Sequence, residues 1–236
     1  MKRVLSVVLL STGLVTACDQ SREDKHGAAP KSVGISMSLP HIFRGTLPCA
    51  DCSGIDTHLE LHSDSSFLLE ERYLSRSMQN NRHIYTLGRF SQDGNILRLD
   101  HSKRGPLFFS IVSPREIKML DQNGHDIDSQ LNYRLRDSDS PVIPTGQMRL
   151  RGHFVKTADD GVFTECESGT RWQLNNTELD EGYEQVGAKE DAPLFATLEV
   201  HLIKQATADN GEKTDAMVVD KVISTATDQD CRPRPL

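Results

Sequence analysis

Apolar and polar residues alternate along much of this chain, and the pattern limits it to folds built from half-buried β-strands. In residues 55–62, Ile, Thr, Leu and Leu occupy the odd positions, while Asp, His, Glu and His occupy the even ones. A strand places successive side chains on opposite faces, so this segment has one apolar and one polar face. Turn-forming pairs such as Asp93-Gly94 and Asn123-Gly124 separate the segments. The chain is therefore predicted to be all-β.

The first domain, predicted at residues 41–137, contains eight such segments. Short turns between them favour an antiparallel meander, and closing it into a small barrel removes the exposed edge strands. The expected strands are 41–46, 55–62, 67–73, 84–90, 96–100, 107–112, 116–120 and 130–135.

A linker rich in proline, serine and charge at 138–147 separates this domain from a second one at 148–236. The second domain is predicted to be an OB-fold barrel, because five strands with one intervening helix fit the oligonucleotide/oligosaccharide-binding fold. The expected strands are 148–155, 161–166, 171–174, 194–204 and 217–223, with the helix at 176–186 starting at Asn176.

The N-terminus has the layout of a lipoprotein export signal. Lys2 and Arg3 precede a short apolar stretch, and small residues precede Cys18. Cleavage is predicted to remove residues 1–17 and to leave Cys18 as the lipidated first residue; the alternative is an ordinary secretory signal that happens to end near a cysteine. The polar segment 18–40 is then a lipidated cysteine followed by a flexible tether, which places the body of the protein at the periplasmic side of a membrane.

Charge and motif content exclude several function classes. The formal net charge is −7, and loss of Lys2 and Arg3 with the signal makes it −9, so the body repels nucleic acid. The sequence has no nucleophile elbow, phosphate loop or HExxH zinc motif. We therefore expect neither nucleic-acid binding nor enzyme activity, and no required cofactor.

Four cysteines remain after lipidation of Cys18, namely Cys49, Cys52, Cys166 and Cys231. An even number in an oxidising compartment predicts disulfides, and four cysteines allow three pairings. The linker favours local pairing within each domain. In the chain-entropy model, a bond from Cys166 to Cys231 stabilises by roughly 4 kcal/mol and the tight CxxC bond by only about 2 kcal/mol.

The CxxC pair, Cys49 and Cys52, is the most distinctive motif. It leads through Ser53-Gly54 into a strand, whereas a catalytic dithiol usually opens a helix. A zinc site would need a second regularly spaced ligand pair. Copper fits better, because thiolates bind Cu(I) and imidazoles bind Cu(II); the candidate ligands are Cys49, Cys52, His58 and His62. The alternative is that these histidines simply line the wet outer face of the barrel.

Several segments resemble the NlpE/CutF lipoproteins of Gram-negative bacteria over about residues 42–231. They are FRGTLPCADCSGIDTHLELHSDSSFLLEERYL, IYTLGRF, MLDQNGHDIDSQLNYRL, MRLRGHFVKTADDGVFTECESGTRWQL and the terminal DQDC. The resemblance implies a lipocalin-like N-terminal barrel, an OB-fold C-terminal domain and activation of the inner-membrane Cpx sensor kinase under surface, lipoprotein-trafficking or redox stress. It also implies a role in copper tolerance, with Cys49 and Cys52 as a metal or redox element and Cys166 and Cys231 as the C-terminal disulfide.

The chain departs from the pattern of the NlpE-like family at the residue that determines in which membrane a lipoprotein stays. NlpE-like proteins are usually outer-membrane lipoproteins, whereas Asp19 directly after the lipidated cysteine favours retention in the inner membrane of enteric bacteria. The expected partners are the Cpx kinase, a membrane reached through the lipid, and the periplasmic disulfide-forming machinery. The alternative functions are a copper-binding or copper-buffering lipoprotein and a lipocalin-like carrier of small ligands.

Overall fold

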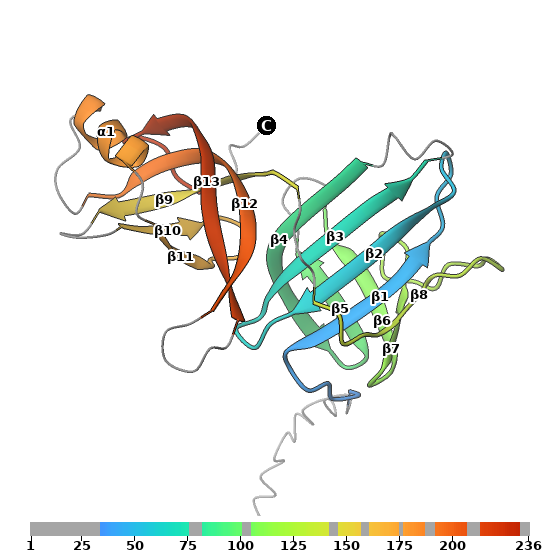
Figure 1. Ribbon diagram of the computed structural model, residues 1–236. Helices are drawn as coiled ribbons and strands as arrows, with labels where there is room; N and C mark the ends of the chain where they lie inside the picture. The colour runs from blue at the N-terminus through green and yellow to red at the C-terminus, as the bar shows by residue number, and fades with distance from the viewer. Residues whose placement is uncertain are drawn as a thin grey trace, which may run out of the picture. The chain divides into compact units, whose positions relative to one another are not determined.

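The computed structural model describes residues 34–75, 82–100, 105–141, 146–156, 161–174, 177–186, 192–206 and 213–231. The described part of the chain forms a closed eight-stranded barrel and a five-stranded sheet with one helix (Figure 1). The predicted all-β fold class, a small barrel followed by an OB-type domain, is confirmed. The barrel strands are β1 (His41–Leu47), β2 (Gly54–Leu61), β3 (Ser66–Leu74), β4 (Arg82–Asp93), β5 (Ile96–Asp100), β6 (Leu107–Ser113), β7 (Glu116–Met119) and β8 (Arg134–Asp137).

The barrel is an antiparallel meander in which each strand pairs with the next one along the chain. It closes where β1 pairs with β8, with Phe43 opposite Asp137 and Arg44 opposite Arg136. Closure satisfies the backbone donors and acceptors that an open edge would leave exposed. The register also fixes the polar face, since it places His58 of β2 directly opposite Glu70 of β3.

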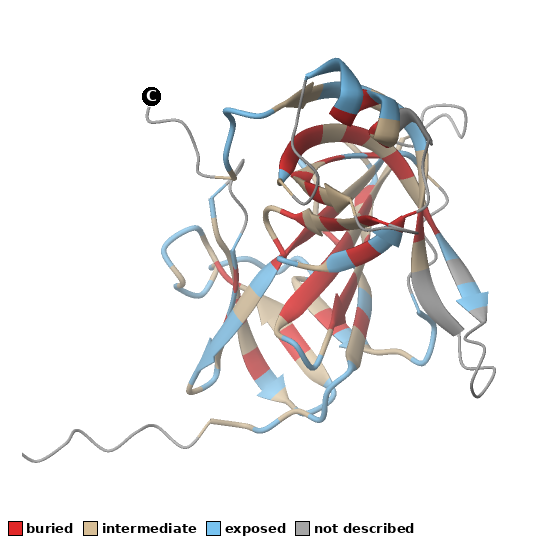
Figure 2. Ribbon diagram, turned by 90° about the vertical axis from the view of Figure 1, so that its left-hand side faces the viewer, coloured by how far each residue is buried: buried red, intermediate tan, exposed pale blue. Residues whose placement is uncertain are grey.

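Apolar side chains from the barrel strands form a buried core. Figure 2 marks the buried positions in red along the ribbon. Eight strands enclose a space that is just wide enough for such a core. Phe43 and Phe67 are both 0% exposed. The alternative of a small-ligand carrier, which would need an open apolar cavity, stays a prediction. The buried core residues are Phe43, Leu47, Leu59, Leu61, Phe67, Leu69, Leu97, Leu99, Phe109, Ile111, Ile117 and Leu135.

The last barrel strand starts at Arg134, four residues later than the sequence predicts. Side chains take over the backbone hydrogen bonds in the preceding segment: Ser129 Oγ accepts from the N–H of Leu131, and Asn132 Oδ1 accepts from the N–H of Arg134. Short polar side chains of this kind compete with sheet pairing. Leu131, which the alternation places in a strand, is 62% exposed.

The described end of the predicted tether, residues 34–40, lies against the barrel. Ile35 and Met37 pack on the barrel core. The N–H of Ile35 donates to Asn95 Oδ1 at 2.7 Å, and its carbonyl accepts from Gln92 Nε2 at 2.8 Å. The rest of the tether, including Cys18 and Asp19, lies outside the described residues.

The second domain has the strand order β11-β10-β9-β12-β13 with a helix between β11 and β12, which is the OB arrangement. Its elements are β9 (Met148–Lys156), β10 (Gly161–Glu165), β11 (Arg171–Leu174), α1 (Thr177–Gln185), β12 (Leu194–Ala206) and β13 (Lys213–Ala226). The observed strands overlap all five predicted ones. Asn176, the predicted helix start, lies outside the described residues.

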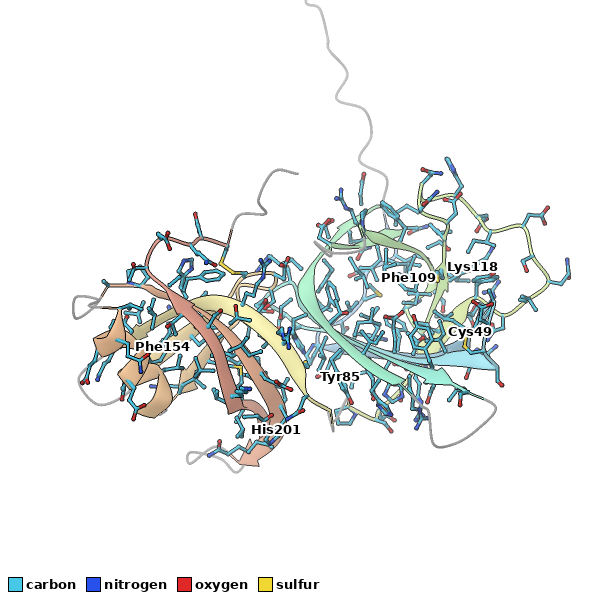
Figure 3. The ribbon with its side chains drawn as sticks, turned by 90° about the horizontal axis from the view of Figure 1, so that it is seen from above. Cys49, Tyr85, Phe109, Lys118, Phe154 and His201 are labelled. Carbon is cyan, nitrogen blue, oxygen red and sulfur yellow. A yellow bond between two sulfur atoms is a disulfide. The ribbon has the colours of Figure 1, made fainter. Side chains whose placement is uncertain are left out.

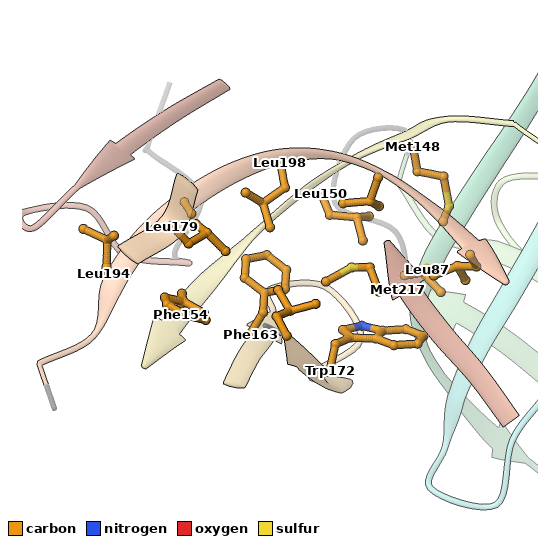
Figure 4. Close-up of a cluster of buried hydrophobic side chains, with 14 of the residues drawn as sticks. Leu87, Met148, Leu150, Phe154, Phe163, Trp172, Leu179, Leu194, Leu198 and Met217 are labelled. Carbon is orange, nitrogen blue, oxygen red and sulfur yellow. The ribbon is translucent and has the colours of Figure 1, made fainter. Parts of the chain in front are cut away.

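Helix α1 covers one end of the second core. Leu179 is 0% and Tyr183 4% exposed, and Tyr183 Oη donates to the carbonyl of Phe154 at 3.0 Å. Beneath them lie Phe154, Phe163 and other apolar residues of the sheet (Figure 4). In the described part of the chain, no helix has the length and apolar character needed to cross a membrane.

Phe163→Ala tests the second core. Phe163 is 0% exposed, so its truncation should cost about 3–5 kcal/mol of unfolding free energy through lost burial and a residual cavity. Urea unfolding measures the change. Ile203→Ala, at a position 40% exposed on β12 of the same sheet, is the control and should shift stability by less than about 0.5 kcal/mol. Equal unfolding midpoints for the two variants would contradict this account of the core.

Candidate functional site

The CxxC motif forms a short loop between β1 and β2, closed by a disulfide between Cys49 and Cys52 (Figure 3). The loop leads into β2, as the sequence predicts, and the N–H of Ser53 donates to the carbonyl of Leu74 at 2.9 Å. Gly54 has φ of 153°, and a Cβ there would lie 2.6 Å from Thr46 Cγ2, so the turn requires glycine. No helix N-terminus follows the motif to lower a thiol pKa. The loop therefore lacks the setting of a catalytic dithiol.

The polar face of β2 begins with a carboxylate held between two guanidinium groups. Arg44 Nη2 donates to Asp56 Oδ2 at 3.1 Å, and Arg72 donates to the same oxygen. Burial alone raises the pKa of Asp56, but the hydrogen bonds and charges of Arg44 and Arg72 outweigh it and hold this pKa below its ordinary value of 3.8. Asp56 is therefore ionised at neutral pH and ties β2 to both of its neighbouring strands.

His58 lies next on this face, opposite Glu70. Its Nδ1 is 3.7 Å from Glu70 Oε2, too long for a hydrogen bond, and both ring nitrogens are buried without a hydrogen-bond partner among the described residues. Burial lowers the pKa of His58, and the charge of Arg44 lowers it further. These effects favour the neutral imidazole, which is the form that binds metals.

Glu70 links this face to β4. Its Oε1 accepts from Tyr85 Oη at 3.1 Å and lies 3.1 Å from His83 Nδ1. The sequence pattern did not single out Glu70 and Tyr85, because β3 and β4, which bring them together, are not adjacent to the CxxC motif in the sequence. The strand register, once known, places them there.

His62 lies at the end of the polar face and contacts Ser66 and Glu60. Its Nδ1 lies 2.8 Å from Ser66 Oγ, and its Nε2 lies 3.4 Å from Glu60 Oε1. His41 lies at the barrel seam instead, 3.1 Å from Asp137 and stacked on Phe43. The alternating face of β2 is thus largely occupied by interactions with neighbouring strands.

The four candidate copper ligands do not form a cluster. Within the described residues, the one group of three ligand-type side chains with ligand atoms within 4.8 Å of one another is His153, Asp230 and Cys231. Cys49 and Cys52 are bonded to each other, while His58 and His62 face Glu70 and Ser66. Metal binding by Cys49, Cys52, His58 and His62 stays a prediction.

The second disulfide joins Cys166, directly after β10, to Cys231, which follows β13. It spans 65 positions of sequence, and both bonds match the local pairing that the domain layout favours. The N–H of Cys166 donates to the carbonyl of Arg151 at 2.8 Å. His153 of β9 lies beside the bond, with Nδ1 3.5 Å from Cys231 Sγ.

A buried carboxyl group holds the turn that follows β10. Glu165, 2% exposed, accepts hydrogen bonds from the N–H of Glu167 at 3.0 Å and from the N–H and hydroxyl of Ser168 at 2.7 Å. Burial raises the pKa of Glu165. These contacts fix the backbone beside Cys166.

Asp56→Asn tests the electrostatics of the barrel face. Because the folded pKa of Asp56 lies below its unfolded value, its contribution is present above about pH 4 and is lost as pH falls through the folded pKa. The variant should therefore lose more unfolding free energy relative to wild type at pH 6 than at pH 2.5, measured by urea unfolding at both values. Asp126→Asn, an exposed carboxylate paired with Lys118, is the control and should have little effect at either pH. A constant wild-type-to-variant difference at both pH values would contradict the ion-pair account.

Comparisons with known proteins cover both domains. The family described as NlpE N-terminal domain matches residues 43–130, and the family described as NlpE C-terminal OB domain matches residues 144–232. Both families are lipoprotein domains rather than enzymes, in agreement with the expectation from the motif content.

One relative matches along almost the whole chain. Lipoprotein NlpE of Escherichia coli (strain K12) is 30% identical over 229 residues, which cover 97% of this chain and 95% of that protein. The crystal structure of the Cpx pathway activator NlpE from Escherichia coli is 31% identical, covers 82% of this chain and 98% of its own, and has a TM-score of 0.36. The two domain matches and the full-length identity lead to one conclusion: the chain belongs to the NlpE lipoprotein family.

Proposed function

We propose that this chain is a lipid-anchored envelope sensor that activates the Cpx sensor kinase in response to surface, lipoprotein-trafficking or redox stress. The observation that carries the proposal is the similarity to NlpE through both domains and along 97% of the chain. The relative of solved structure is itself described as a Cpx pathway activator.

The proposed response to failed lipoprotein trafficking depends on the N-terminus. Acylation of Cys18 would hold the protein at a membrane surface, since two or more acyl chains anchor stably. When transport to the outer membrane fails, lipidated molecules accumulate beside the inner-membrane kinase. Their local concentration rises without any new contact being formed, which is sufficient to shift a weak binding equilibrium.

The proposed response to redox stress depends on the second domain. The Cys166–Cys231 bond closes a loop of 65 positions around the OB sheet, and its absence would remove roughly 4 kcal/mol of stabilisation in the chain-entropy model. A molecule that escapes the periplasmic disulfide-forming machinery would therefore have a weakened second domain. That weakening is the local event that a redox sensor needs.

The role in copper tolerance rests on Cys49 and Cys52. Both are bonded in this structure, so they can act as thiolate ligands only after reduction. His58, whose lowered pKa favours the neutral form, is the candidate imidazole closest to them along the chain. The alternative of a dedicated copper buffer requires the CxxC pair to stay reduced in the periplasm.

A Cpx reporter tests the proposed response to redox stress. Cells making the Cys166→Ser/Cys231→Ser variant should give higher output than cells making equal amounts of wild type, because the variant mimics a chain that was never oxidised. The Cys49→Ser/Cys52→Ser variant is the matched control and should resemble wild type. Unchanged output from the Cys166→Ser/Cys231→Ser variant, with the protein present at wild-type level, would rule out redox sensing through this bond.

Asp19 is proposed to hold a fraction of the molecules in the inner membrane, next to the kinase. Asp19→Ser should move that fraction to the outer membrane and lower unstressed Cpx output, as measured by density-gradient separation of the membranes and by the reporter. Gln20→Ser, at the neighbouring position, serves as the control. Identical membrane distribution of wild type and Asp19→Ser would contradict this role.

A further inference from the structure

The surroundings of the Cys166–Cys231 disulfide contain more ligand-type groups than a structural bond requires. His153, Asp230 and Cys231 place one potential ligand atom each within 4.8 Å of the others, and Cys166 adds a fourth group through its bond to Cys231. This cluster combines sulfur, imidazole and carboxylate in one place. It lies in the second domain and is separate in sequence from the CxxC motif.

His153 is held firmly in position. It lies on β9, the central strand of the sheet, opposite Thr164 of β10 and Phe195 of β12. Its ring packs edge-on against Phe195, with ring centres 5.5 Å apart. The imidazole is therefore oriented by the sheet before any ligand arrives, which lowers the cost of binding.

The distances around this ring are also compatible with metal coordination. Nδ1 lies 3.5 Å from Cys231 Sγ. Zinc bonds of about 2.05 Å to nitrogen and 2.3 Å to sulfur, at a tetrahedral angle, would separate the two ligand atoms by about 3.6 Å. On the other side of the ring, Nε2 lies 4.0 Å from Asp230 Oδ1, where a small shift would let the carboxylate accept the Nε2 proton. A carboxylate in this role commonly orients a zinc-bound histidine.

We propose that, when the Cys166–Cys231 bond is open, Cys166, Cys231 and His153 bind a zinc ion, and Asp230 orients His153. Two thiolates and one imidazole suit the borderline-soft Zn²⁺ ion and leave its fourth position for water. The side chains of His153 and Asp230 are 27% and 53% exposed, so an ion can reach the site from solvent. The site differs from the candidate copper ligands and does not depend on the proposed signalling role.

The chemistry links metal binding to the redox state. A dithiol reductant breaks the S–S bond with two electrons and two protons, giving two thiols and leaving as a disulfide; a newly exported chain already carries the thiols. Zn²⁺ then displaces one proton from each thiol. Because the bound thiolates are no longer free to attack or to be oxidised, zinc should preserve the open form of the bond.

Zinc affinity is measured on the full mature lipoprotein in detergent, carrying Cys49→Ser/Cys52→Ser so that Cys166 and Cys231 supply the thiolates. The reduced protein, freed of reductant without oxygen, is titrated with Zn²⁺ against a chromogenic chelator. It should bind one Zn²⁺ per chain, and the oxidised protein should bind at least about 100-fold more weakly, because a disulfide offers no thiolate.

Further substitutions in the Cys49→Ser/Cys52→Ser protein distinguish zinc binding at this site from unspecific zinc binding. His153→Ala should weaken binding at least about tenfold, and Asp230→Asn should weaken it within the 10–100-fold range typical of an orienting carboxylate. His201→Ala is the matched control, since His201 on β12 also pairs with a carboxylate, Asp220, at 2.8 Å. It should leave zinc affinity unchanged. No zinc binding by the reduced parent, or equal affinities for the parent and His153→Ala, would overturn the proposal.

A second measurement covers the case in which the reduced domain unfolds. Zinc should then restore a cooperative thermal unfolding transition to the reduced parent but not to His153→Ala, because metal that binds only the folded state stabilises it. Zinc should also slow reformation of the Cys166–Cys231 bond, followed by thiol alkylation over time. A reduced chain that stays unfolded with zinc, or that reoxidises at the same rate with and without it, would overturn the proposal.

Discussion

The Cys166–Cys231 bond connects the turn after β10 to the segment after β13, and thus fixes the last strand's exit relative to the first half of the OB sheet. The OB sheet is an open five-stranded layer whose core is shared with one short helix, so it lacks the complete hydrogen-bonded closure that stabilises the barrel. A covalent link across 65 positions compensates by restricting the unfolded chain. The same link is chemically reversible, so its reduction should lower the stability of the second domain.

The barrel is stabilised by non-covalent interactions rather than by a long-range disulfide. Its strands close through β1 and β8, its interior is packed with apolar side chains, and its polar face carries ion pairs across β1, β2 and β3. Asp56 can stay charged in a partly buried position because two guanidinium groups share it, whereas burial and the charge of Arg44 lower the pKa of His58. The CxxC disulfide closes only a short turn on this scaffold, so its reduction should leave the barrel intact. The two disulfides therefore differ in what their loss would do to the fold.

Much of this architecture could be predicted from the sequence because the period-two alternation is a local property of each strand. The alternation gave the positions of β2 and β5 to within a residue. The linker at 138–147 stays a prediction. The start of β8 was missed because Ser129 and Asn132 satisfy backbone donors that alternation alone assigns to a strand. The docking of Ile35 on Gln92 and Asn95 was missed because it joins segments about 60 positions apart.

In the candidate sites, too, local sequence features could be predicted and contacts between distant segments could not. The CxxC motif is contiguous and visible in the sequence, and so is the alternating face of His58 and His62. The proximity of His153 to Cys231 depends on the register of β9 and on the path of the chain after β13, which no local pattern encodes. Contacts of this kind, 78 positions apart, require the assembled sheet.

We propose that the redox state of the Cys166–Cys231 bond controls the signalling state of the protein. The most direct test is to trap free thiols by alkylation in cells in which disulfide formation is gradually reduced, and to read Cpx output from the same cultures. Cpx output should rise in step with the fraction of molecules whose Cys166 and Cys231 are reduced, whatever the redox state of Cys49 and Cys52. Output that rises while Cys166 and Cys231 remain fully bonded, or that stays flat when they are fully reduced, would contradict it.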